Sequence, residues 1–315
     1  MLLLLCHDGD LMKTVVNLMD VMEKYNTDEH CRETLAHLRW PNGVKCLRCK
    51  SDNVAPVKER KVYVCYSCQY QFSATVGTIF HDSHLPLTKW FFVTYLMTES
   101  RKGIPANQIK RMFGVSYKTA WYLCHRIRAA MAAASTTPLG GTVEVDETYV
   151  GGKQRGCRKP GFGDSKKQIV IGIRQRGGEL RFFHAEDAKS GTLSKYIREN
   201  ISADVDVIMT DEFGSYPSAI AKAGVLGEHK TICHKQKIYV DGDIHTNTVE
   251  SAFSLLKRGI IGTWHRISAK HLEAYLNEMC FRFNNRKNPY LFRDTLLKMI
   301  ESENVEYKEL TQAAA

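Results

Sequence analysis

Three acidic residues occupy positions that are typical of a phosphoryl-transfer site. Asp146 ends the strand-like run VEVD and Asp211 ends DVIMTD, whereas Glu250 lies on the helical run NTVESAFSLLKRG. Carboxylates at the ends of adjacent strands can converge on hard divalent cations. Two such cations about 4 Å apart can activate an attacking oxygen and stabilise the leaving one. The pattern therefore predicts metal-dependent phosphoryl transfer.

Each of these acids also has a simpler interpretation. Asp146 and Asp211 could cap the ends of ordinary strands. Asn247-Thr-Val-Glu250 could form a capping box at the start of its helix, and this role is compatible with metal binding. Three neighbouring acids are expected to be solvated or to support the site from outside it: Glu144, Glu147 and Glu212.

Lys257 follows Glu250 by seven residues. Seven residues are almost two helical turns, so the two side chains lie on one face of the helix. The acid would then reach the metal while the lysine reaches a phosphate of the substrate. The adjacent apolar stripe, which we expect to pack on a sheet, comprises Val249, Phe253, Leu256 and Ile260.

Four cysteines form two Cys-x-x-Cys pairs, Cys46 with Cys49 and Cys65 with Cys68, separated by fifteen residues. This spacing is typical of a tetrahedral zinc site. The alternatives are incidental pairs or a redox pair, but a redox pair would open a helix beside a parallel sheet. We predict a structural Zn²⁺, because so small a segment buries too little apolar surface to fold without one. Core or surface thiols are expected at Cys31, Cys124, Cys157, Cys233 and Cys280.

Residues 104–128 read IPANQIKRMFGVSYKTAWYLCHRIR, a pattern typical of a helix-turn-helix. The first helix is expected from about Ala106 to Phe113 and ends at Gly114, and Ser116 caps the second. The buried stripe of the second helix is expected at Ala120, Leu123, Cys124 and Ile127. The side chains that face outward, and would contact DNA in the major groove, are Tyr117, Lys118, Tyr122, His125 and Arg126.

The charge of the chain indicates an acidic partner. The formal net charge of the 315 residues is +10 and the isoelectric point is about 9.0, so nucleic acid is the first candidate. Residues 86–130 contain eight lysines and arginines but one glutamate. A plain helical hairpin with a solvated basic face is the alternative interpretation of this segment.

No apolar run is long enough to predict a membrane-spanning helix. The opening MLLLLC lacks a basic start, and His7, Asp8 and Asp10 end its apolar run, so it is not typical of a signal peptide. The cysteines fit a reducing compartment better than a disulfide framework. We expect a cytoplasmic protein, associated with the nucleoid when bound to DNA, without a membrane partner.

The chain is expected to form an α/β multidomain protein. After the small-residue and turn-rich run AAASTTPLGG, short β-branched runs alternate with helical segments, which predicts a mixed sheet covered by helices. The expected order is a helical N-terminal segment (1–40), a zinc ribbon (41–85), a helix-turn-helix domain (86–131), a linker (132–141), the sheet domain (142–292) and a C-terminal helix or tail (293–315).

Residues 151–167 read GGKQRGCRKPGFGDSKK, with six lysines and arginines, one aspartate and five glycines. Such a segment cannot pack a core, so we expect it to be mobile in the free protein. We predict that it closes on DNA phosphates beside Asp146, with Lys153 and Arg155 among the contacts. A solvated hairpin tip is the alternative.

The chain resembles the DDE insertion-sequence transposases of the Merlin-like type. The resemblance spans roughly residues 30–292 and rests on the following stretches: LRWPNGVKCLRC, YVCYSCQYQFSATVGTIFHDSHLPLTKWF, VEVDETYVGGK, DEFGSY, HTNTVESAFSLLKRGIIGTWH and NEMCFRFNNR.

This resemblance implies a zinc ribbon, a helix-turn-helix and an RNase H-like catalytic domain whose first three strands are antiparallel. It implies that Asp146, Asp211 and Glu250 are the catalytic triad, with Lys257 as a basic companion, and that the cofactor is Mg²⁺ or Mn²⁺. Asn247 also stands near the third acidic position, and Glu250 is the better ligand for a hard metal.

The leading functional hypothesis is a transposase that binds the terminal inverted repeats of its own element, cleaves DNA with two metal ions and transfers the strand to target DNA. It would act on double-stranded DNA as a homodimer or higher oligomer, with Lys257 and Arg258 among the DNA contacts. The alternatives are a nuclease or resolvase of the same fold that cuts without joining, and a transcription regulator that does not cut.

Overall fold

The computed structural model describes residues 17–132, 137–151, 167–232 and 245–312. Several predictions lie outside these residues: those for residues 1–16, for most of the segment 151–167 with Lys153, Arg155 and Cys157, for Cys233 and for linker residues 133–136.

The chain forms two compact units. The first comprises residues 1–133 and 285–315, and the second comprises residues 134–284. The C-terminal segment thus returns to the first unit. The sequence predicts a sheet domain that extends to residue 292, whereas the second unit ends at residue 284.

The first unit begins with two short helices and a small sheet. Asn17 caps α1 (Leu18–Lys24), and Thr27 caps α2 (Asp28–Arg39) by accepting a hydrogen bond from the backbone of the first turn. A three-stranded antiparallel sheet follows, in the order β1-β2-β3. Its strands are β1 (Val54–Val57), β2 (Val62–Cys65) and β3 (Gln71–Phe72), with the 3-10 turn η1 (Lys58–Arg60) between the first two.

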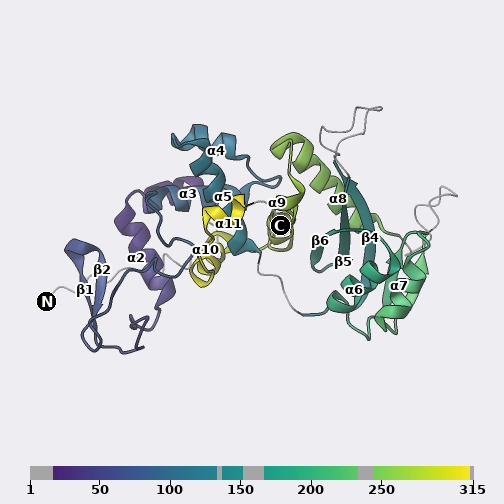
Figure 1. Ribbon diagram of the computed structural model, residues 1–315, viewed down its shortest axis with the longest axis horizontal. Coiled ribbons are helices and arrows are strands. Elements are labelled where there is room, and N and C mark those ends of the chain that lie inside the picture. The colour runs from purple at the N-terminus through teal and green to yellow at the C-terminus, as the bar shows by residue number, and fades with distance from the viewer. Residues whose placement is uncertain (1–16, 133–136, 152–166, 233–244, 313–315) are drawn as a thin grey trace. The chain divides into compact units, whose positions relative to one another are not determined.

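The remainder of the first unit is helical (Figure 1). Helix α10 packs against α2, α3 and α5 through buried side chains that include Phe292, Leu296 and Met299. This packing explains why the C-terminal segment belongs to the first unit. The helices of this part are α3 (Leu87–Glu99), α4 (Ala106–Phe113), α5 (Tyr117–Met131), α10 (Leu291–Glu301) and α11 (Tyr307–Thr311).

The second unit contains a five-stranded mixed sheet in the order β6-β5-β4-β7-β8. Strands β4, β5 and β6 pair antiparallel. Strand β7 pairs parallel to β4, and β8 pairs parallel to β7. The expected mixed sheet is therefore confirmed. Its strands are β4 (Thr142–Val150), β5 (Gln168–Gln175), β6 (Leu180–Ala185), β7 (Val207–Thr210) and β8 (Glu228–Thr231).

Helices cover both faces of this sheet (Figure 1). Side chains alternate between the faces of a strand. Val143 and Val145 accordingly pack in the core with α6 and α7, whereas Val150 packs in the core with α8 and α9. Glu144 and Asp146 therefore belong to the face that α8 covers. The helices are α6 (Ser190–Asn200), α7 (Tyr216–Ala223), α8 (Asn247–Gly259) with the π turn η3 (Ile260–Trp264), and α9 (Ala269–Asn284).

Candidate active site

Two of the predicted acids meet where β7 ends beside β4. The expectation that Asp146 ends its strand is wrong, because β4 continues to Val150, whereas Asp211 does follow β7. The parallel pairing of β4 with β7 sets Glu144 beside Met209, so Asp146 and Asp211, each two residues further along, lie side by side. A ligand oxygen from each of Asp146, Glu147 and Asp211 can be chosen so that all three lie within 4.8 Å of one another. Glu147, which the sequence analysis set outside the site, therefore belongs to this acidic cluster.

The cluster is electrostatically costly without a cation. Burial, reinforced by the negative charges of Glu147 and Asp211, raises the pKa of Asp146 to about 8. The charge of Glu250 raises it further, although a backbone N–H of Glu147 opposes the shift. A site that concentrates buried like charges in this way has a strong demand for positive charge.

Glu250 stands close to the cluster but outside the group of three. Its charge acts on Asp146, and its Oε1 accepts a hydrogen bond of 2.8 Å from the Thr246 hydroxyl. The N-cap of α8 is Thr246, and neither it nor Asn247 caps the helix with its side chain. The capping box expected from Asn247 to Glu250 is thus wrong, because Glu250 lies one position too far into the helix.

Glu147 is held from the opposite face of β4. Its Oε2 accepts a hydrogen bond of 2.6 Å from the hydroxyl of the buried Tyr216 at the start of α7. Burial raises the pKa of Glu147, and it raises the pKa of Tyr216 well above its ordinary value. The pair fixes Glu147 at the rim of the acidic cluster.

Helix α8 approaches the sheet over a glycine. Gly172 pairs with Asp146 across β4 and β5, and a Cβ on it would lie 2.7 Å from the Phe253 ring and 2.9 Å from Val249 Cγ2. The apolar stripe predicted for α8 is confirmed: Val249, Phe253 and Leu256 are buried against this face, with Ile260 partly buried beside them. Lys257 and Arg258 are exposed on the same helix.

We predict that Gly172→Ala destabilises the protein, because the added methyl group would force α8, and Glu250 with it, away from Asp146. Overpacking of this kind costs about 1–3 kcal/mol, measurable by denaturant unfolding. Gly191→Ala in α6 is the matched control, since a Cβ there meets nothing within 4 Å and alanine favours a helix. Equal stability of the two variants would contradict this account of the close approach.

The four predicted cysteines converge in the first unit. Cys46 Sγ lies 3.6 Å from Cys68 Sγ, and Cys49 Sγ lies 3.5 Å from Cys65 Sγ. All four Sγ atoms lie within 4.8 Å of one another. Zn–S bonds of about 2.3 Å in a tetrahedron place sulfurs at comparable separations. The small core around them contains Phe72, Trp40 and Tyr63.

The helix-turn-helix has the predicted boundaries. Gly114 ends α4 in the left-handed conformation, and the Ser116 side chain caps α5 through the backbone N–H of Thr119. The predicted buried stripe of α5 is confirmed at all four positions: Ala120, Leu123, Cys124 and Ile127. Tyr117 is 49% exposed and Lys118 is also exposed at the start of this helix.

Two other side chains of α5 do not face outward as expected. His125 and Arg126 are 2% and 3% exposed. Arg126 donates a hydrogen bond of 2.6 Å to the His81 carbonyl and stacks over Trp90 at 5.0 Å. The expectation was wrong because a single helix does not reveal what packs on its polar side.

The C-terminal segment also reaches this side of α5. Tyr122, which is half-buried, donates a hydrogen bond of 2.7 Å to the Val305 carbonyl, and Lys118 Nζ lies 4.3 Å from the centre of the Tyr307 ring. Of the five side chains predicted to contact DNA on this helix, Tyr117 and Lys118 thus remain the accessible ones.

Comparison with known proteins identifies a domain in each unit. Residues 138–284 match the ISXO2-like transposase domain, and residues 26–71 match the transposase zinc-ribbon domain. The chain therefore carries an ISXO2-like transposase domain together with a transposase zinc ribbon. The first match contains Asp146, Asp211 and Glu250, and the second contains the four clustered cysteines.

Two further proteins are similar to this transposase. A Halobacterium salinarum protein, described as an uncharacterized protein in transposable element ISH50, is 29% identical over 279 residues, which cover 83% of this chain and 92% of the relative. A chain of a pre-cleavage Mos1 transpososome shares 9% identity, with 69% of this chain and 80% of that chain covered. Its TM-score of 0.24 is too low to support an argument about the fold. Among the described residues, no helix has the length and apolar character needed to cross a membrane.

Proposed function

We propose that this transposase binds the terminal inverted repeats of its insertion sequence, cleaves a phosphodiester at each end and joins the freed 3′-hydroxyl to target DNA. The observation that carries the proposal is the convergence of Asp146 and Asp211, with Glu250 nearby, where β7 ends beside β4. Metal-dependent, chelator-sensitive cutting of labelled end DNA by the purified protein tests it.

The acidic cluster fits a divalent cation. Carboxylate oxygens are the ligands that Mg²⁺ and Mn²⁺ prefer, and the raised pKa of Asp146 reflects burial of its carboxylate beside other negative charges. Asp146, Asp211 and Glu250 would hold the cations, and Glu147 would support them from the Tyr216 side. When bound, such cations stabilise the charge that develops on the phosphate during displacement.

Basic residues beside the acids would place the DNA. Lys257 and Arg258 are exposed near the end of α8, seven and eight positions after Glu250, and would contact phosphates of the transposon end. Since an element has two ends to be cut, we infer that a homodimer or higher oligomer assembles on DNA. A protein with this substrate would work in the cytoplasm, at the nucleoid.

We further propose that the start of α5 reads the transposon end. Tyr117 and Lys118 lie in its first turn, the part of a recognition helix that enters the major groove. The neighbouring Arg126 has a different role, since its guanidinium holds the His81 carbonyl and the Trp90 ring inside the unit.

Lys118→Ala is therefore expected to weaken binding to end DNA by about 1–3 kcal/mol. Its melting temperature should fall only slightly, through loss of the contact with the Tyr307 ring. Arg126→Ala, by contrast, is expected to lower the melting temperature clearly, because the buried side chain loses its hydrogen bond to the His81 carbonyl and its packing on Trp90. Gel-shift titrations and thermal unfolding of both variants test this division. If the Lys118→Ala protein binds end DNA with the affinity of the parent, the proposal that α5 recognises the transposon end is contradicted.

The four cysteines would hold one structural Zn²⁺. The distances between their sulfurs fit a tetrahedrally coordinated ion. The small apolar core around the cysteines cannot stabilise the three-stranded sheet alone.

A further inference from the structure

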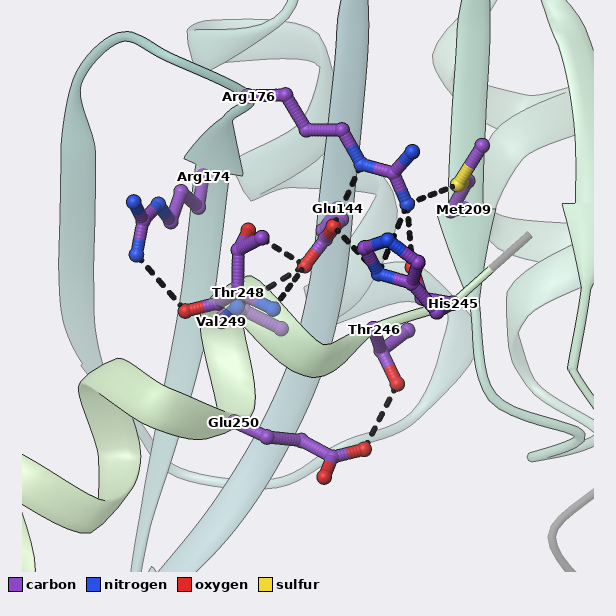
Figure 2. A network of polar contacts seen from close by, with 9 residues as sticks. All are labelled: Glu144, Arg174, Arg176, Met209, His245, Thr246, Thr248, Val249 and Glu250. Carbon is purple, nitrogen blue, oxygen red and sulfur yellow. Dashed lines mark hydrogen bonds and ion pairs between the residues drawn. The ribbon is translucent and has the colours of Figure 1, made fainter. Parts of the chain in front are cut away.

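A buried carboxylate from the sheet holds the first turn of α8 (Figure 2). The side chain of Glu144 is 0% exposed. Its Oε2 accepts hydrogen bonds from the backbone N–H groups of Thr248 at 3.0 Å and Val249 at 2.9 Å, and from the Thr248 hydroxyl at 2.7 Å. A carboxylate in this position satisfies amides that no helical carbonyl can reach and complements the positive end of the helix dipole.

The other oxygen of Glu144 is bound by an arginine, and a histidine lies beside it. Arg176 Nε donates to Oε1 at 2.7 Å, and His245 Nδ1 lies 3.4 Å from the same oxygen. Arg176 in turn donates to the His245 carbonyl at 2.8 Å and contacts Met209 Sδ at 2.9 Å. A buried charge is tolerated only when it is paired and hydrogen bonded in this way, and the same contacts join β4, β7 and the segment that leads into α8.

The position of Glu144 connects it to the acidic cluster. It lies two residues before Asp146 on the face of β4 that α8 covers, and its partner Val249 immediately precedes Glu250. The structure therefore ties the strand of the first acid to the helix of the third. Because neither Thr246 nor Asn247 caps α8 with its side chain, this tie supplies the side-chain cap of the helix.

We propose that Glu144 is a positioning residue that sets the separation between Glu250 and Asp146, and thereby the affinity of the site for divalent cations. This inference rests on the proposed function, in which these acids hold the cations. Glu144 itself would touch neither metal nor DNA, since both of its carboxylate oxygens are directed at the start of α8 and at Arg176 and His245.

The test is a Mn²⁺ titration of the full-length protein without DNA, by calorimetry, for the parent and Glu144→Gln. The amide keeps the size of the side chain but removes the charge that Arg176 and the helix start require. Loss of a group that orients a metal ligand typically weakens binding by roughly 10–100-fold, and we expect a loss in this range. Hydrogen exchange at the Thr248 and Val249 amides should accelerate in parallel.

Glu278→Gln is the matched control. Glu278 is likewise 0% exposed and paired with an arginine, Arg282 at 3.3 Å, but it lies on α9. This variant should retain the Mn²⁺ affinity of the parent even where its melting temperature falls. Should Glu144→Gln fail to fold, Thr248→Val removes one donor to the same carboxylate oxygen and is expected to weaken Mn²⁺ binding roughly fivefold.

Combination with Glu250→Gln separates positioning from other effects. If Glu144 acts through Glu250, adding Glu144→Gln to Glu250→Gln causes no further loss of Mn²⁺ affinity. A folded Glu144→Gln protein with parental affinity, or losses that multiply in the double variant, would overturn the inference. A parent that binds no Mn²⁺ at all would instead overturn the proposed function on which it rests.

Discussion

Asp211→Asn is expected to abolish DNA cleavage and joining while leaving binding to end DNA close to that of the parent, and the same holds for Asp146→Asn and Glu250→Gln. Each substitution keeps the size of the side chain but removes a negative charge that balances the cations. Metal-ion stabilisation of the reacting phosphate amounts to several kcal/mol, so the rate should fall by roughly 10³-fold or more. Binding should persist because the residues proposed to read DNA belong to the other unit.

Asp206→Asn provides the matched control for this series. Asp206 is exposed and directly precedes β7, whereas Asp211 directly follows it. The control should cleave at the parental rate in a labelled end-DNA assay with Mg²⁺. Parental cleavage by Asp211→Asn would instead show that the acidic cluster is not the reaction centre.

Removal of zinc is expected to have the second-largest effect, on the fold of the first unit. Structural Zn²⁺ in small domains contributes about 10–16 kcal/mol of apparent binding free energy, far more than the small core around Phe72 can supply. We expect about one zinc per chain by metal analysis, its loss in Cys65→Ser, and rapid proteolysis within residues 41–75 of that variant.

Cys31→Ala separates this effect from the loss of any buried thiol. Cys31 is fully buried but lies outside the cysteine cluster, so the variant should keep its zinc and the protease resistance of residues 41–75. A well-folded parent that contains no zinc would contradict the assignment of the four cysteines.

Much of the local structure could be predicted because the signals are local. Gly114 and Ser116 mark the turn between α4 and α5 by their conformational and capping preferences, and the structure has the same boundaries. The apolar stripe of α8 likewise indicated the face on which this helix packs. The membership of residues 285–315 could not be predicted in this way, because it depends on tertiary packing of α10.

The acidic site shows the same division. Asp211 was predictable from its place after β7, whereas Asp146 lies within β4 and not at its end. The hydrogen bond from Tyr216 to Glu147 joins segments 69 residues apart and could not be predicted. Glu144 did carry a local signal that sequence analysis undervalued. Glu144 stands between Val143 and Val145 in the middle of a strand, on the same face as Asp146. All three side chains are buried, so Glu144 cannot be solvated there.

Strand joining by the parent protein tests the central claim most directly. Purified protein is incubated with labelled transposon-end DNA, unlabelled target DNA and Mg²⁺ or Mn²⁺, and the products are separated by size. We predict a labelled product longer than the end DNA, dependent on the divalent cation and absent with Asp211→Asn. A protein that cuts the end in the presence of target DNA but never yields the joined product would contradict a transposase and indicate a nuclease.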